Sequence, residues 1–109
     1  MQRMGMVLGI RPEWIAEYKR LHTEVWPDFL KLLSDHGITN YTIFLREPEN
    51  LLFGYWEYVG ADFAADMTIM AGHPCTAEWN ALCMPFQQPL ASIGPGEWWA
   101  PMQDVFHLD

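Results

Sequence analysis

The segment from Glu13 to His36 constrains the fold most, because its apolar residues recur with the period of an α-helix. One face is apolar and the other carries most of the charged residues, as in a helix packed on a core. Pro12 suits the first position of such a helix. Pro27 lies inside the pattern and has no backbone N–H, so we expect a kink or a break after His22. The residues of the apolar face are Ile15, Tyr18, Leu21, Val25, Phe29, Leu32 and Leu33.

Three extended segments surround this helix in the sequence. Met4–Ile10 predicts a first strand ahead of it. Asn40–Leu45 and Leu51–Tyr58 follow it and are rich in β-branched and aromatic residues. The polar residues Arg46–Asn50 separate these two segments, so we expect a β-hairpin.

The second half of the chain adds another helical region and a long irregular segment. The patterns at 62–71 and 76–84 predict helices, divided at Gly72-His73-Pro74. Pro85–Pro101 is rich in proline and glycine, and a loop of this length in a compact domain is usually functional or binds a partner. Met102–His107 alternates and predicts the last strand.

The resulting order, β-α-β-β-α-β, is that of the α+β ferredoxin-like fold, with helices on one face of an antiparallel sheet. At this length we expect one domain over residues 1–109. The strand at Leu51–Tyr58 carries apolar residues on both faces, so it needs cover on both sides. The helices provide one cover. We predict that a second copy of the chain provides the other, in a homodimer.

The composition excludes several classes of partner. With 14 acidic and 6 basic residues, the net charge of −8 argues against nucleic acid and against an anionic membrane surface. No apolar run approaches the ~20 residues of a membrane span, and the first residues lack the layout of a signal peptide. Cys75 and Cys83 are too few for a disulfide framework, so we expect reduced thiols in the cytoplasm. The histidines and cysteines show no metal-binding spacing.

Tyr18 and His22 stand out because they lie one helical turn apart on the apolar face of the predicted helix. Histidine has the ordinary pKa closest to neutral pH, and beside a phenol it is suited to moving protons on a small polar ligand. A histidine on an apolar helical face is, however, more often a hydrogen-bonded core residue. The pattern alone leaves both interpretations open.

Several separated motifs of the chain form a pattern together. They are Glu17-Tyr18-Lys19-Arg20-Leu21-His22, Trp26-Pro27, Asn40-Tyr41, Asn50-Leu51-Leu52-Phe53 and the ending Asp104-Val105-Phe106-His107-Leu108. In order and spacing these motifs resemble the L-rhamnose mutarotase family, and the similarity covers nearly the whole chain. The resemblance implies a dimeric α/β barrel that interconverts the α and β anomers of a deoxy sugar, a small neutral monosaccharide, without a metal or an organic cofactor.

The resemblance also implies roles for individual residues. His22 corresponds to the family's proton donor. Tyr18, Tyr41 and the first member of a Trp-Trp pair, Trp79, correspond to residues that bind the sugar. As general acid to the ring oxygen, or in the mirror role as base, His22 would support ring opening and closing.

Two departures from the family pattern concern the sugar. Asn80 stands where the second tryptophan is expected, and the loop with Trp98 and Trp99 is longer than in the rhamnose enzymes. We expect Asn80 to contact the substrate and the two loop tryptophans to be either a pocket lid or filler in a dimer. L-rhamnose is the expected sugar, with L-fucose, another 6-deoxy-L-hexose, as the alternative.

The sequence is also compatible with other functions. The same scaffold hosts cofactor-free oxygenases and haem-binding proteins, for which His22 would be an axial ligand, and a non-catalytic sugar-binding module is a third class. Asp104, Glu57 and Glu24 are possible second acids, although ordinary solvated surface explains each of them equally well.

Overall fold

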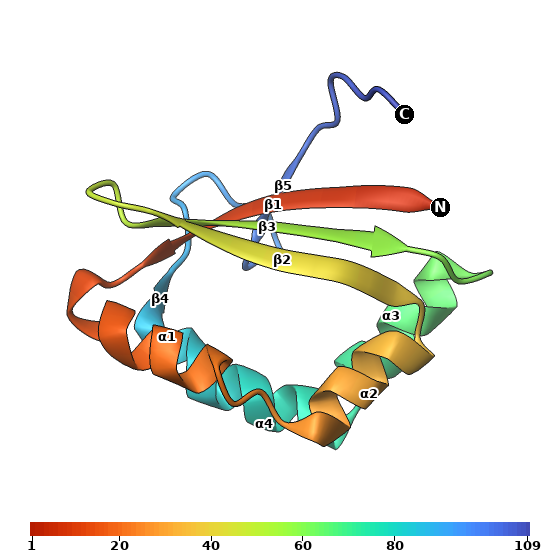
Figure 1. The fold of residues 1–109 in the computed structure, drawn as a ribbon, viewed down its shortest axis with the longest axis horizontal. Coiled ribbons are helices and arrows are strands. Elements are labelled where there is room, and N and C mark those ends of the chain that lie inside the picture. Colours follow the sequence, from red (N-terminus) through yellow and green to blue (C-terminus); the bar gives the residue numbers. More distant parts are fainter.

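A computed structural model describes residues 1–109 as a curled antiparallel sheet covered on one face by helices (Figure 1). The strands are β1 (Gln2–Ile10), β2 (Ile38–Arg46), β3 (Leu51–Tyr58), β4 (Gln87–Gln88) and β5 (Ala100–Met102). The helices are α1 (Ile15–His22), α2 (Pro27–Asp35), α3 (Phe63–Ala71) and α4 (Pro74–Cys83), with 3-10 turns at Pro12–Trp14 and Met84–Phe86. The strand order is β2-β3-β1-β4, and β5 also pairs with β1. This confirms the predicted α+β class and the order of its elements.

The long helical segment divides as predicted. A 3-10 turn at Pro12–Trp14 leads into α1, which ends at His22. α2 then begins at Pro27, because the preceding Trp26 is extended, with φ −58° and ψ 130°. The break turns α2 away from α1 (Figure 1), so that both helices follow the curl of the sheet.

The predicted hairpin is also present, with β2 and β3 antiparallel along most of their length. Its register contains a bulge: Thr39 pairs with Glu57 and Thr42 pairs with Tyr55, so Asn40 and Tyr41 together oppose one residue of β3. Asn40 has a φ of 51°, in the left-handed region. A bulge of this kind re-aims the side chains next to it, and here it affects Tyr41.

The prediction for the last strand is wrong in its bounds. Two short strands share the place beside β1: β4 pairs with Gly9 and Ile10, and β5 pairs with residues 5–7. The residues after Met102 form no strand, and Arg3 contacts Asp104 through an ion pair of 3.2 Å where the ladder would continue. The alternating pattern of 102–107 could not reveal this, because alternation shows a tendency to pair but not the partner.

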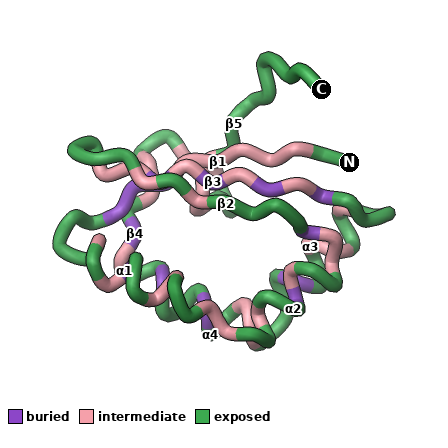
Figure 2. Tube along the Cα trace, in the orientation of Figure 1, coloured by how far each residue is buried: buried purple, intermediate pink, exposed green.

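The two faces of β3 differ as the helix layer requires. Leu52, Trp56 and Tyr58 are buried toward the helices, whereas Phe53 and Tyr55 are half-buried on the outer face. Figure 2 shows buried positions on β3, α1, α2 and α4, while the C-terminal segment is exposed. The helices thus cover one face of this strand and leave the other uncovered within the protomer.

Both cysteines are free thiols, and Cys83 is buried. None of the helices is long and apolar enough to cross a bilayer. No group of three or more His, Cys, Asp or Glu side chains is placed to hold a metal ion.

Candidate active site

Three adjoining cavities lie between the inner face of the sheet and the helices, and all three are lined by His22 and Ile43. Their volumes are about 310, 240 and 290 Å³. The cavity of about 240 Å³ brings together all five residues predicted for the site. They are Tyr18 and His22 from α1, Tyr41 from the bulge of β2, and Trp79 and Asn80 from α4.

His22 occupies the last position of α1, where its ring is held by the backbone. Its Nδ1 lies 2.8 Å from the carbonyl oxygen of Tyr18. Because a carbonyl oxygen only accepts hydrogen bonds, Nδ1 carries the proton and donates it. In the neutral imidazole the lone pair is therefore on Nε2, which has no protein partner.

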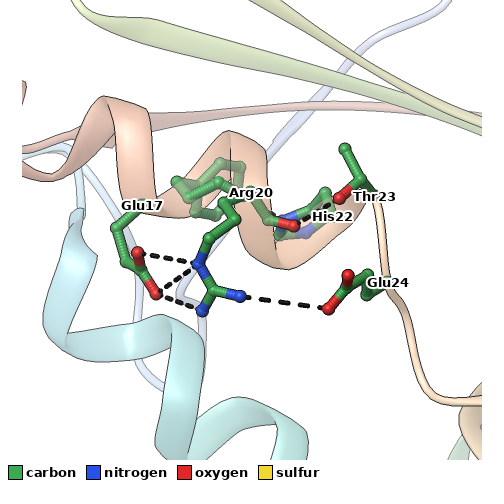
Figure 3. Close-up of polar contacts among 6 residues, drawn as sticks. Glu17, Arg20, His22, Thr23 and Glu24 are labelled. Atoms are coloured by element: carbon green, nitrogen blue, oxygen red, sulfur yellow. Dashed lines mark hydrogen bonds and ion pairs between the residues drawn. The ribbon is translucent and has the colours of Figure 1, made fainter.

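Arg20 of α1 pairs with carboxylates, and no charged side chain contributes to the pKa shift of His22. Figure 3 shows Arg20 bonded to Glu17 and to Glu24. Arg20 and Glu24 are largely exposed, and Glu17 is partly exposed. Burial lowers the pKa of His22 below its ordinary value, although the hydrogen bond to the Tyr18 backbone acts in the opposite direction. His22 is therefore neutral at pH 7 and able to accept a proton at Nε2.

The two tyrosines remain protonated phenols at neutral pH. Burial raises the pKa of Tyr18 well above its ordinary value, and nearby Cys83 and Tyr41 add to this effect. Burial of its hydroxyl raises the pKa of Tyr41 to about 12, although 39% of the residue is exposed. Both side chains are therefore hydrogen-bonding groups for a ligand and not bases.

Trp79 is the centre of an aromatic cluster. The ring centroid of Phe29 lies 5.4 Å away, nearly parallel to it, and covers one face of the indole. Trp26 and His22 approach at 5.2 and 5.4 Å with their rings steeply inclined to it. Trp79 is buried, at 7% exposure, so these contacts fix the wall on which His22 rests.

The long loop reaches the cavity. Trp98 and Trp99 both line it, together with Asn80, so both tryptophans are part of the pocket. Trp99 packs against the buried cluster that includes Tyr18 and Leu52. The Nε1–H of Trp98 donates to Oε1 of Gln87 at 2.9 Å.

Sequence reasoning missed Gln87, which is 5% exposed and lines the same cavity. It lies in a segment that was expected to be irregular, and no spacing marked it. It also missed Cys83, whose pKa is raised to about 12 by burial, so that this thiol is protonated at neutral pH. The apolar lining from Phe29 and Ile43 follows from the helix and strand patterns and could have been predicted from them.

None of the possible second acids lies at the cavity. Glu24 is exposed and paired with Arg20. Glu57 accepts hydrogen bonds from Asn40 and Tyr55, and Asp104 pairs with Arg3. The cavity of about 240 Å³ therefore contains His22 as its one group suited to proton transfer near neutral pH.

Comparisons with known proteins agree on one family. A family model described as L-rhamnose mutarotase matches residues 3–108. A protein of Oceanobacillus iheyensis is 30% identical over 109 residues, covering 100% of both chains. One of Mannheimia succiniciproducens is 32% identical over 105 residues, covering 96% of this chain and 80% of its own. Both relatives are named L-rhamnose mutarotase.

Two solved structures show the same fold. The crystal structure of an L-rhamnose mutarotase from Formosa agariphila has a TM-score of 0.80 at 23% identity, with 100% of both chains covered. Tetracenomycin F2 cyclase from Streptomyces glaucescens, a type-II polyketide cyclase, has a TM-score of 0.71 at 18% identity, again with 100% of both chains covered. Both have the dimeric α/β-barrel fold.

Proposed function

Because the chain belongs to the L-rhamnose mutarotase family, we propose that it interconverts the α and β anomers of L-rhamnose by proton transfer through His22. One observation carries the catalytic assignment. The Nδ1 of His22 is held by the Tyr18 carbonyl, which leaves the Nε2 lone pair at a cavity of sugar size. The comparisons do not favour the oxygenase, haem-binding or non-catalytic readings.

The proposed reaction conserves protons over each cycle. His22 Nε2 accepts the proton of the anomeric hydroxyl while the bond between the anomeric carbon and the ring oxygen breaks. The imidazolium then gives this proton to the ring oxygen, which leaves an open-chain aldehyde. The aldehyde rotates and the steps reverse on its other face. Acid–base help of this kind is typically worth about 10²–10⁴-fold.

The cavity walls support a 6-deoxy sugar as substrate. The cavity of about 310 Å³ is apolar apart from His22 and Tyr41, with Phe29, Leu33 and Trp79 among its lining residues. A methyl group fits against the apolar residues, whereas a hydroxyl group placed there would be left without a partner. Tyr18, Tyr41 and Asn80 supply hydrogen-bonding groups on the other side.

A homodimer is the proposed working form. The outer face of the sheet carries Phe44, which is 61% exposed and pairs in register with Phe53. The C-terminal segment adds Val105 and Phe106, exposed at 87% and 81%. A specific interface over these residues should bury at least ~1,000 Å². A single domain over residues 1–109 and a cytoplasmic location also stay predictions.

Saturation-transfer NMR tests the proposed activity directly. Exchange between the anomers of L-rhamnose should exceed the solvent rate in proportion to protein concentration. The same measurement with L-fucose tests the alternative substrate, because L-rhamnose and L-fucose differ only in the orientation of ring hydroxyls. Binding of L-rhamnose with exchange at the solvent rate would show a sugar-binding module and overturn the proposal.

A further inference from the structure

Gln87 is a buried polar side chain whose orientation is determined by its neighbour. The indole Nε1–H of Trp98 lies 2.9 Å from the amide of Gln87. An indole N–H can donate a hydrogen bond but cannot accept one. The amide oxygen must therefore face Trp98, and the amide NH₂ group must point the other way.

Tyr18 is the second hydrogen-bond partner of the Gln87 side chain. Tyr18 and Gln87 line the same cavity and both are buried, at 5% exposure each. A side-chain hydrogen bond with Gln87 lowers the pKa of Tyr18 against the larger effect of burial. An NH₂ group can only donate, so the Tyr18 oxygen accepts from it.

Once its oxygen accepts from Gln87, the Tyr18 hydroxyl keeps its own proton free to donate. The structure contains no hydrogen bond from this hydroxyl to a protein acceptor, since the side-chain hydrogen bond of Tyr18 is the one with Gln87. The hydrogen bonds thus run in one direction, from Trp98 to Gln87 to Tyr18 and on to a ligand.

The same cavity then holds a donor and an acceptor. The ring centroids of Tyr18 and His22 are 4.1 Å apart and both side chains line the cavity, one with a hydroxyl that can donate and the other with an Nε2 that can accept. A cyclic hemiacetal offers the complementary pair on two oxygens that are bonded to the same carbon. Its anomeric hydroxyl can donate, whereas its ring oxygen can only accept.

We propose that Gln87, held by Trp98, is a positioning residue that fixes Tyr18 as the hydrogen-bond donor to the ring oxygen of the sugar. This deepens the proposed function and rests on it for the identity of the ligand. It assigns Tyr18 to one atom of the sugar. It also assigns a function to the long loop, because Trp98 belongs to that loop.

Replacing Gln87→Glu tests the direction of the hydrogen bonds at nearly constant shape. An ionised carboxylate only accepts, so it would bond both Trp98 and the Tyr18 proton and remove the donor from the ring oxygen. A protonated carboxyl has one donor and one acceptor, as the amide has. Exchange relative to wild type should fall about tenfold at pH 8 and recover as the pH drops through the pKa of the introduced carboxyl, which burial raises.

Other titratable groups do not produce this recovery. Those that share the cavity with Gln87 are Tyr18, His22, Tyr41 and Cys83, and no Asp, Glu, Lys or Arg lines it. The two phenols and the thiol have raised pKa values and stay protonated over this range. Titration of His22 is cancelled by dividing by the wild-type rate at each pH. The rate of anomer exchange should stay low at every pH in Gln87→Leu. In Gln88→Glu, at the exposed neighbouring position of β4, the rate should match that of the wild type.

A binding experiment isolates the ring oxygen without any turnover. The probes are L-rhamnose and its carba-analogue, in which a methylene group replaces the ring oxygen. At pH 8, Gln87→Glu should weaken the binding of L-rhamnose about tenfold. It should change the affinity for the carba-analogue by no more than about twofold, because the lost contact is absent there. Equal losses for both ligands, or a pH profile parallel to wild type, would overturn the proposal.

Failure of the proposed function gives a different result. Wild-type protein that neither binds nor converts L-rhamnose overturns the activity and the assignment of Tyr18 to a sugar atom together. The hydrogen bond from Trp98 to residue 87 is then tested at the Trp98 indole N–H by NMR. Its protection from solvent exchange should be lost in Gln87→Leu and kept in Gln87→Glu. Circular dichroism at both ends of the pH range verifies that each variant is folded.

Discussion

His22 and Tyr18 contact each other twice, once through the backbone and once through their rings. Nδ1 of His22 lies 2.8 Å from the Tyr18 carbonyl oxygen, and the two ring centroids are 4.1 Å apart. The first contact selects the tautomer of the histidine, and the second packs the imidazole against the tyrosine ring. Both contacts follow from the spacing of one helical turn.

Removing the imidazole should abolish most of the proposed activity. His22→Ala should slow anomer exchange by about two to three orders of magnitude, the usual span for losing a general acid–base. The chain offers a matched control, because His36 makes the same 2.8 Å contact with the carbonyl of Leu32 and lines none of the three cavities. His36→Ala should keep near wild-type exchange. A folded His22→Ala protein that exchanges anomers at the wild-type rate would shift the assignment to Tyr18 or Tyr41.

The pH profile should report the lowered pKa of His22. Burial disfavours the imidazolium, so the neutral base persists to a pH below the ordinary value of 6.5. Exchange should be constant between pH 7 and 8 and fall only at a pH below 6.5, as the imidazole takes up a proton. The histidine Cε1–H resonance, followed by NMR through the same titration, should move with the rate. An inflection above the ordinary value would contradict a neutral buried histidine.

Specificity should depend on the wall formed by α4 and the long loop. Asn80 lines the cavity together with Trp98 and Trp99, so a larger side chain there must compete with both indoles for space. Asn80→Trp should change the ratio of exchange rates for L-rhamnose and L-fucose by about tenfold, the scale of a gained or lost pocket contact. Glu78→Trp, at an exposed position of the same helix, is the control and should leave the ratio unchanged. An unchanged ratio in Asn80→Trp would show that Asn80 does not set specificity.

Local rules explain which parts of this fold were predictable. Pro27 divides the helix because a missing N–H acts at its own position, whatever the chain does elsewhere. The spacing of Tyr18 and His22 placed them on one face for a similar reason. The contact of Trp98 with Gln87 joins two segments that have no periodic pattern, so no local signal announced it. The predicted bounds of the last strand were wrong for the same reason, because its pairing depends on which edge of β1 remains free.

The outer face of the sheet should carry the dimer contact. Wild-type protein should sediment as a dimer at low micromolar concentration, because the helices leave Phe44 and Phe53 without cover. Phe44→Glu should shift the protein toward monomer, since burying an unpaired carboxylate in an apolar interface is costly. Ile69→Glu is the matched control: Ile69 is 53% exposed on α3, away from this face, and its replacement should leave the dimer intact. A wild-type monomer with full anomer exchange would show that the uncovered face serves another purpose and that one protomer suffices for the activity.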